Sequence, residues 1–166
     1  MVMKHQSWTA GQYGQVAASW HEDTPAPPAA DSRLTLELAT LALLSRVRRQ
    51  VRSFLQDSLD SDGGAGCGPD EAQDAVESAI LVIDELASNA VRHGLAPASL
   101  HVCDEPGRWV VMVTDSAPHR RPTPARDRPA EAGGMGLYVV ADLTAEHGVH
   151  YAPAHKIVWV CIDKPR

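Results

Sequence analysis

The chain has 166 residues, of which 15 are Lys or Arg and 21 are Asp or Glu, so its formal net charge is -6 at pH 7. This length suits one domain with a substantial core, and the acidic balance argues against a binding mode dominated by nucleic-acid phosphates. Because no stretch approaches a membrane span and the first residues lead into no apolar segment, we expect a cytoplasmic protein.

Residues 1–32 carry little apolar periodicity and include the run Pro25-Ala26-Pro27-Pro28. This composition predicts a flexible or loosely docked extension, followed by one folded domain at 33–166. Trp8, Tyr13 and Trp20 complicate the interpretation. Aromatic side chains in such an arm dock either on a partner or on the arm's own domain.

Residues 34–38 alternate between Leu and polar side chains, which predicts a strand. A helix is expected next, because apolar residues recur at helical spacing from Leu41 to Leu59. Its other faces carry a basic cluster, which is either solvated or a docking surface for an acidic partner. The cluster consists of Arg46, Arg48, Arg49 and Arg52.

Residues 61–68 are rich in glycine but lack the Gly-Lys-Ser/Thr ending of a P-loop, so they predict a flexible connector. The three cysteines, Cys67, Cys103 and Cys161, are widely spaced and odd in number. We therefore expect free thiols and neither a disulfide framework nor a zinc site.

The most informative element is a helix predicted from Pro69 to His93 and ended by Gly94. Its apolar residues form one broad stripe, as a core-facing helix requires. On the other side Glu85 and Asn89 lie one turn apart, and His93 follows one turn later, so a carboxylate, an amide and an imidazole are stacked. The Asn89 carbonyl together with phosphate oxygens would suit Mg²⁺. The simpler alternative is an amphipathic helix whose polar residues are merely solvated.

Two hairpins are predicted after this helix. Residues 99–103 and 109–114 flank a turn at 104–108, and residues 147–151 and 156–162 flank a second turn. Asp115 comes directly after the first hairpin, where an aspartate is either an ordinary turn residue or an acceptor in a pocket.

Residues 116–132 carry four Arg and four Pro and show no periodicity, so their Arg side chains are either solvated or reach a phosphate group. Gly133 to Leu137 then leads into a helix that runs to about Leu143. Backbone N–H groups beside a helix start favour phosphate. The alternative is a plain loop entering a helix. A dinucleotide-binding motif is excluded because Val139 stands where the third Gly would be.

The order of these motifs resembles that of the GHKL, or Bergerat-type, ATPases over about residues 34–163. The helix with Glu85, Asn89 and His93 resembles the N-box of that family, Asp115 its G1 position, and Gly133 to Leu137 its G2 box. The loop at 116–132 stands where the family has its ATP lid. The resemblance implies ATP and Mg²⁺ as cofactors.

Roles for individual residues follow from the resemblance. Glu85 is expected to be the general base, Asn89 to hold Mg²⁺, and Asp115 to accept a hydrogen bond from the adenine amino group. The residues expected to contact the nucleotide are Asn89, His93, Asp115, Ala117, Gly133, Gly134, Met135, Gly136 and Leu137. The family pattern Asp-x-Gly-x-Gly reads Asp115-Ser116-Ala117-Pro118-His119 here, so the backbone near the nucleotide departs from the family.

The small size is similar to that of the anti-sigma regulatory factor kinases, which bind a sigma factor and phosphorylate Ser or Thr of an antagonist protein. The fold implied is an α/β two-layer sandwich, with helices on one face of a mixed β-sheet. The implied partners are a sigma factor and an antagonist, without direct nucleic-acid or membrane binding, and a homodimer is left open. The alternatives are a non-catalytic, ATP-gated binding module and a detached histidine-kinase-type catalytic domain.

Overall fold

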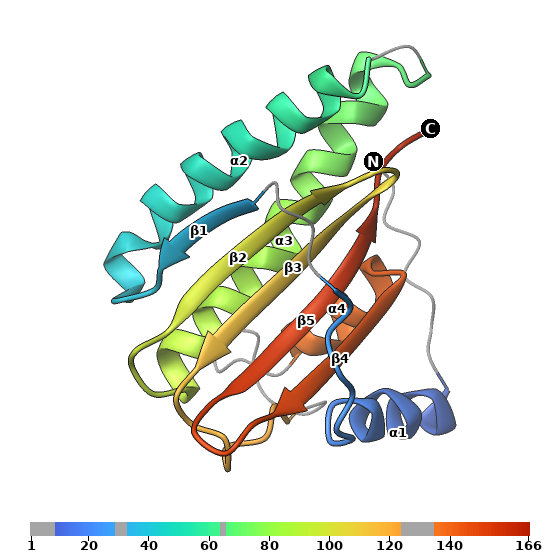
Figure 1. Cartoon of the computed structure of the whole chain (residues 1–166). Helices are drawn as coiled ribbons and strands as arrows, with labels where there is room; N and C mark the ends of the chain where they lie inside the picture. Colours follow the sequence, from blue (N-terminus) through green and yellow to red (C-terminus); the bar gives the residue numbers. More distant parts are fainter. Residues whose placement is uncertain (1–8, 29–32, 64–65, 124–134) are drawn as a thin grey trace.

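The computed structural model describes residues 9–28, 33–63, 66–123 and 135–166. The strands are β1 (Arg33–Glu37), β2 (Ser99–Glu105), β3 (Arg108–Asp115), β4 (Glu146–Tyr151) and β5 (Lys156–Asp163). The helices are α1 (Ala10–Ser19), α2 (Leu44–Ser61), α3 (Pro69–His93) and α4 (Met135–Leu143), with a 3₁₀ turn, η1 (Leu41–Leu43), before α2. Within these ranges, three helices pack on one face of a five-stranded sheet and a fourth, α1, lies beside the β4 edge (Figure 1). The α/β fold class is confirmed.

The strand order is β1-β2-β3-β5-β4, and every neighbouring pair is antiparallel. The expectation of a mixed sheet is therefore wrong for these five strands. The pairs β2–β3 and β4–β5 are hairpins, which are antiparallel by construction, and β5 returns beside β3 in the opposite direction. Among the described residues, a parallel contact occurs as an isolated bridge between Asp23 and Val149.

Helix α3 begins and ends where the sequence predicts. Gly68 precedes it, and its N–H donates to the Glu71 carboxylate at 3.2 Å, while Pro69 takes the first turn, where its missing N–H costs nothing. The apolar stripe is buried against the sheet and α2. Its buried residues are Val76, Ala79, Ile80, Val82, Ile83, Leu86, Ala87 and Ala90. This burial fixes the rotation of α3 and therefore the direction of its polar side.

Helix α2 lies along α3 and is held there by apolar and charged contacts. Its buried residues are Leu44, Val47, Val51, Leu55 and Ser58. Two arginines of the basic cluster form ion pairs with α3, Arg48 with Asp84 at 3.1 Å and Arg52 with Glu77. All four of these side chains are more than a third exposed, so the pairs contribute little stability.

The N-terminal segment is more tightly docked than the sequence indicated. Residues 10–19 form α1, and Trp20, which follows it, is fully buried in the main core and stacked on His147 at 4.5 Å. The chain then runs along β4, where Thr24 N–H donates to Val149 at 2.8 Å. The description of residues 1–32 as a loose extension therefore does not fit residues 9–28. Individual contacts, such as those of Trp20 and Thr24, hold this segment on the domain. Because these contacts do not recur at a regular spacing, the apolar periodicity of the sequence did not predict the docking.

Beyond β4 the same segment crosses the sheet face opposite α2 and α3 (Figure 1). There the Trp159 indole N–H donates to the Thr24 carbonyl at 2.9 Å. The apolar cluster on this face contains Cys103 and Cys161, which lie in register on either side of Val110. Because β3 separates them, they cannot form a disulfide, and the prediction of free thiols is confirmed for all three cysteines.

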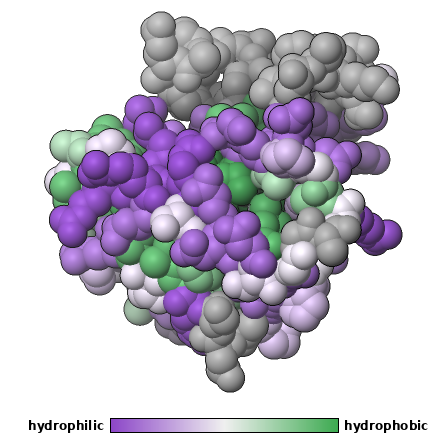
Figure 2. Space-filling model, turned by 90° about the horizontal axis from the view of Figure 1, so that it is seen from above, coloured by the Kyte–Doolittle hydropathy of each residue, from purple (hydrophilic) through white to green (hydrophobic). Residues whose placement is uncertain are grey.

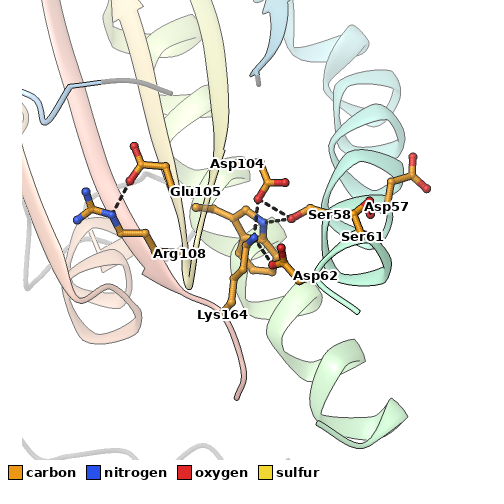
Figure 3. A network of polar contacts seen from close by, with 9 residues as sticks. Asp57, Ser58, Ser61, Asp62, Asp104, Glu105, Arg108 and Lys164 are labelled. Carbon is orange, nitrogen blue, oxygen red and sulfur yellow. Dashed lines mark hydrogen bonds and ion pairs between the residues drawn. The ribbon is translucent and has the colours of Figure 1, made fainter. Parts of the chain in front are cut away.

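A second polar network lies at the end of the sheet where β5 finishes (Figure 3). Lys164 follows β5, its side chain is 3% exposed, and its ammonium lies 2.5 Å from both Asp62 and Asp104. The Ser58 hydroxyl donates to Asp104 at 2.7 Å and accepts from the Trp109 indole at 2.9 Å. Burial alone would lower the pKa of Lys164, but the two carboxylates hold it above its ordinary value. The network ties the C-terminal residues to α2 and β2.

Figure 2 views the molecule from the top of Figure 1 and shows hydrophilic side chains over much of the described part of that face, with hydrophobic side chains visible between them. Within the described ranges, no helix has the length and apolar character needed to cross a membrane.

Candidate functional site

A cavity of about 450 Å³ lies where α3 and β3 end, within the size range of small-molecule sites. Its walls come from the last two turns of α3, the end of β3, the segment after it, α4 and the start of β5. The polar lining residues are Asn89, Arg92, His93, Asp115, Arg120, Arg121, Thr123 and Lys156. Apolar side chains such as Leu86, Val113 and Leu137 line the rest. A cavity with both apolar and charged walls is suited to a small molecule that has an apolar part and a polar part.

Asp115 and Lys156 form a buried ion pair in this cavity. The two residues are register partners, because Asp115 ends β3 where Lys156 begins β5. Their charged groups are 2.8 Å apart, and the side chains are only 3% and 5% exposed. Ala117 completes the arrangement, since its N–H donates to Asp115 Oδ1 at 2.8 Å and its carbonyl accepts from Lys156 Nζ at 3.1 Å. These contacts hold both charged groups in fixed positions on the cavity wall.

The sequence did not single out Lys156. A lone lysine at the start of a strand is most often a solvated residue. The alternation of side chains along β5 could have predicted its burial, because Lys156 is in phase with Val158 and Val160, whose side chains are buried. A residue in phase with the inward face is expected to point into the molecule.

Gly94 is required by the close approach of the chain to Asp115. It ends α3 as predicted, with an extended conformation and a negative φ. A methyl group at this position would lie 2.7 Å from Asp115 Cγ and would overlap the Ala90 carbonyl. The following segment is also attached to the end of β3, because Ser116 N–H donates to the Leu95 carbonyl at 2.9 Å.

Glu85 lies one turn before Asn89 and packs against α4. A methyl group at Gly136 would overlap the Glu85 carboxylate, so in this arrangement the Glu85 side chain lies directly against the backbone of α4. Burial raises the pKa of Glu85, the neighbouring Asp84 carboxylate raises it further, and Arg92 opposes the shift. A half-buried carboxylate with a raised pKa accepts a proton more readily than a solvated one.

The structure brings together most of the residues that the sequence singled out. Asn89, His93, Asp115 and Leu137 line the cavity, and Ala117 is buried beside Asp115. Glu85 and Gly136 touch each other beside these lining residues. Met135 begins α4, whereas Gly133 and Gly134 lie outside the described residues, as do residues 124–132 of the expected lid. Arg120 and Arg121 line the cavity, and Arg120 donates to the His93 carbonyl at 3.3 Å.

The described part of the cavity wall offers few side chains that could coordinate a metal ion. Among the described residues, no three His, Cys, Asp or Glu side chains come close enough to hold one. Asn89 supplies an amide oxygen on the cavity wall. This donor set fits Mg²⁺ carried on substrate phosphates, because Mg²⁺ prefers oxygen and retains several waters.

Comparisons with known proteins agree with this arrangement. A family model described as a histidine kinase-like ATPase domain matches residues 39–162. The crystal structure of the RsbU and RsbW domains of Rv1364c from Mycobacterium tuberculosis is similar, with a TM-score of 0.53 and 18% identity, and the match covers 81% of this chain and 33% of that one. This chain thus spans about a third of that structure, and at this identity the likeness concerns the fold alone.

The Acinetobacter baumannii histidine kinase AdeS also matches, with a TM-score of 0.41 and 13% identity, over 94% of this chain and 77% of that one. A comparison with curated proteins found no match.

Proposed function

The chain belongs to the family of histidine kinase-like ATPase domains, and we propose that it binds Mg-ATP and transfers the terminal phosphate to a Ser or Thr of a protein antagonist. In this proposal it is an anti-sigma-type regulator. Its partners are then a sigma factor and the antagonist. The observation that carries the catalytic part is the position of Glu85, half-buried against Gly136 and one turn before the cavity-lining Asn89.

In this proposal the cavity receives both ends of the nucleotide. Asp115, on the wall of the cavity, accepts a hydrogen bond from the adenine amino group, and apolar residues such as Val113 pack on the ring. The phosphates lie toward the start of α4, where helix N–H groups favour anions. The Asn89 carbonyl would hold Mg²⁺, which supplies charge neutralisation on the phosphates when bound.

Glu85 acts on the incoming hydroxyl. The hydroxyl oxygen of the Ser or Thr forms a bond to the γ-phosphorus, the bond from that phosphorus to the bridging oxygen breaks, and ADP leaves. The hydroxyl proton passes to Glu85, whose raised pKa makes it a better acceptor than a solvated carboxylate. Arg120 and Arg121 lie on the cavity wall, where a guanidinium pairs well with phosphate oxygens.

The test is Glu85→Gln, which keeps the size of the side chain and removes its basicity. We expect ADP affinity to stay unchanged, while phosphate transfer from labelled ATP to antagonist proteins encoded nearby falls roughly 10²- to 10⁴-fold. The matched control is Glu77→Gln, the same substitution on the exposed surface of the same helix. It should leave both quantities unchanged.

The outcomes separate the alternatives. Equal phosphate transfer by Glu85→Gln and the wild type would remove Glu85 from the catalytic role. If the wild type binds ADP and captures its partner but transfers no phosphate, the chain is an ATP-gated binding module. Absence of ADP binding by the folded wild type would remove the nucleotide assignment itself.

A further inference from the structure

We propose that Lys156 is a specificity-determining residue that reads the nucleobase together with Asp115, donating a hydrogen bond from its ammonium group to ring nitrogen N1 of adenine. The inference rests on the proposed nucleotide binding and adds to it a contact that the sequence motifs do not contain. It concerns the choice of base, and it is independent of whether phosphate transfer occurs.

Within the described part of the chain, the contacts of Lys156 leave one N–H of its ammonium group available to a ligand. An ammonium group has three N–H donors. Its nitrogen lies 2.8 Å from both Asp115 oxygens, so one N–H directed between them serves the carboxylate, and a second donates to the Ala117 carbonyl at 3.1 Å. The side chain is 5% exposed and still lines the cavity, so its remaining donor is directed at whatever fills that space. A buried donor without an acceptor is costly.

Asp115 retains acceptor capacity in the same place. A carboxylate has about four lone-pair positions, and the Ala117 N–H and the Lys156 ammonium are its two hydrogen-bond donors among the described residues. The cavity wall therefore presents an acceptor directly beside a donor, 2.8 Å apart. Gly94 and the hydrogen bonds of Ala117 hold this pair in a single arrangement.

This pair complements the edge of adenine. Adenine presents its amino group, a donor, next to N1, an acceptor, so Asp115 accepts from the amino group while Lys156 donates to N1. Guanine in the same pose would place its carbonyl oxygen against the Asp115 carboxylate and its N1–H against the Lys156 ammonium. Two unfavourable contacts would then replace two hydrogen bonds, which is how a buried polar site rejects a close analogue.

The direct test leaves the protein unchanged and alters the ligand. Calorimetry on the wild-type chain would compare ADP with 1-deaza-ADP, in which a C–H group replaces N1 and the amino group is retained. We expect 1-deaza-ADP to bind roughly 10- to 100-fold more weakly, because a hydrogen bond to a charged group is lost. The control is 7-deaza-ADP, which changes a ring atom away from this edge and should bind about as tightly as ADP.

A substitution at Lys156 tests whether this residue causes the difference in affinity between ADP and 1-deaza-ADP. In Lys156→Met the ratio of ADP affinity to 1-deaza-ADP affinity should fall to about one, whereas Lys164→Met should keep the wild-type ratio. Lys164 is the matched control, since it is also buried beside aspartate but does not line the cavity. If Lys156→Met does not fold, the analogue series on the wild-type chain still decides.

Two results would be decisive against the inference. Equal affinity of the wild type for ADP and 1-deaza-ADP would overturn the contact with N1, and so would an unchanged affinity ratio in folded Lys156→Met. Failure of the wild type to bind any of the three nucleotides would instead refute the proposed function, so the two failures are distinguishable.

Discussion

Two buried lysines lie at the two ends of β5, and their surroundings differ. The difference indicates a ligand-binding role for one lysine and a structural role for the other. Lys156 begins β5 and Lys164 follows its end, and both side chains lie on the inward face at 5% and 3% exposure. Lys164 is enclosed by two carboxylates and lies away from the cavity. Lys156 has one carboxylate and one carbonyl, and lines the cavity. Each lysine has two partners among the described residues, so the charge of those partners and the position beside the cavity distinguish a tie between segments from a group able to bind a ligand.

The largest expected effect on stability comes from Lys156→Met. It leaves the Asp115 carboxylate, 3% exposed, without its cation, so the free energy of unfolding should fall by about 3 to 5 kcal/mol. Adding Asp115→Asn should recover much of this loss, because no uncompensated charge then stays buried. Urea unfolding would measure both. A loss below about 1 kcal/mol for the single variant would mean that water reaches the pair.

Lys164→Met should cost somewhat less, about 2 to 4 kcal/mol. The Asp62 side chain is 48% exposed and can turn to water, while Asp104 keeps its hydrogen bond from Ser58. The increase in Tm produced by saturating ADP should equal that of the wild type, because this network lies away from the cavity. A reduced ADP effect in this variant would show that the two ends of β5 are coupled.

The smallest effects come from one glycine at each end of the sheet. Gly94→Ala pushes a methyl group against Asp115 and should cost about 1 to 3 kcal/mol, together with weaker ADP binding. Gly107→Ala should cost about 1 kcal/mol because its φ is +77°, but the space around it is open and ADP affinity should not change. Unfolding curves and calorimetry on both variants would show this contrast, and equal ADP affinities would contradict it.

Periodic elements were predictable, and isolated contacts were not. The limits of α3 and the two hairpins follow from apolar spacing and turn residues, and Asn89, His93 and Asp115 converge on one cavity as their motif order indicates. Helix α1 was missed because its attachment depends on single anchors, such as Trp20 in the core. Lys156 was missed because its place in the cavity depends on its pairing with Asp115. That pairing is set by the register of β3 and β5, which the sequence pattern does not give.

The docking of residues 20–24 along β4 limits how the chain can be shortened. The part that matches the family model, residues 39–162, lacks Trp20, the β4 bridge, β1 and Lys164. A fragment cut at those limits would expose the backbone groups of β2 on one side and β4 on the other, as well as the pocket that Trp20 fills. Open strands of this kind pair with other chains, so such a fragment would aggregate unless the segment around Trp20, β1 and Lys164 were retained.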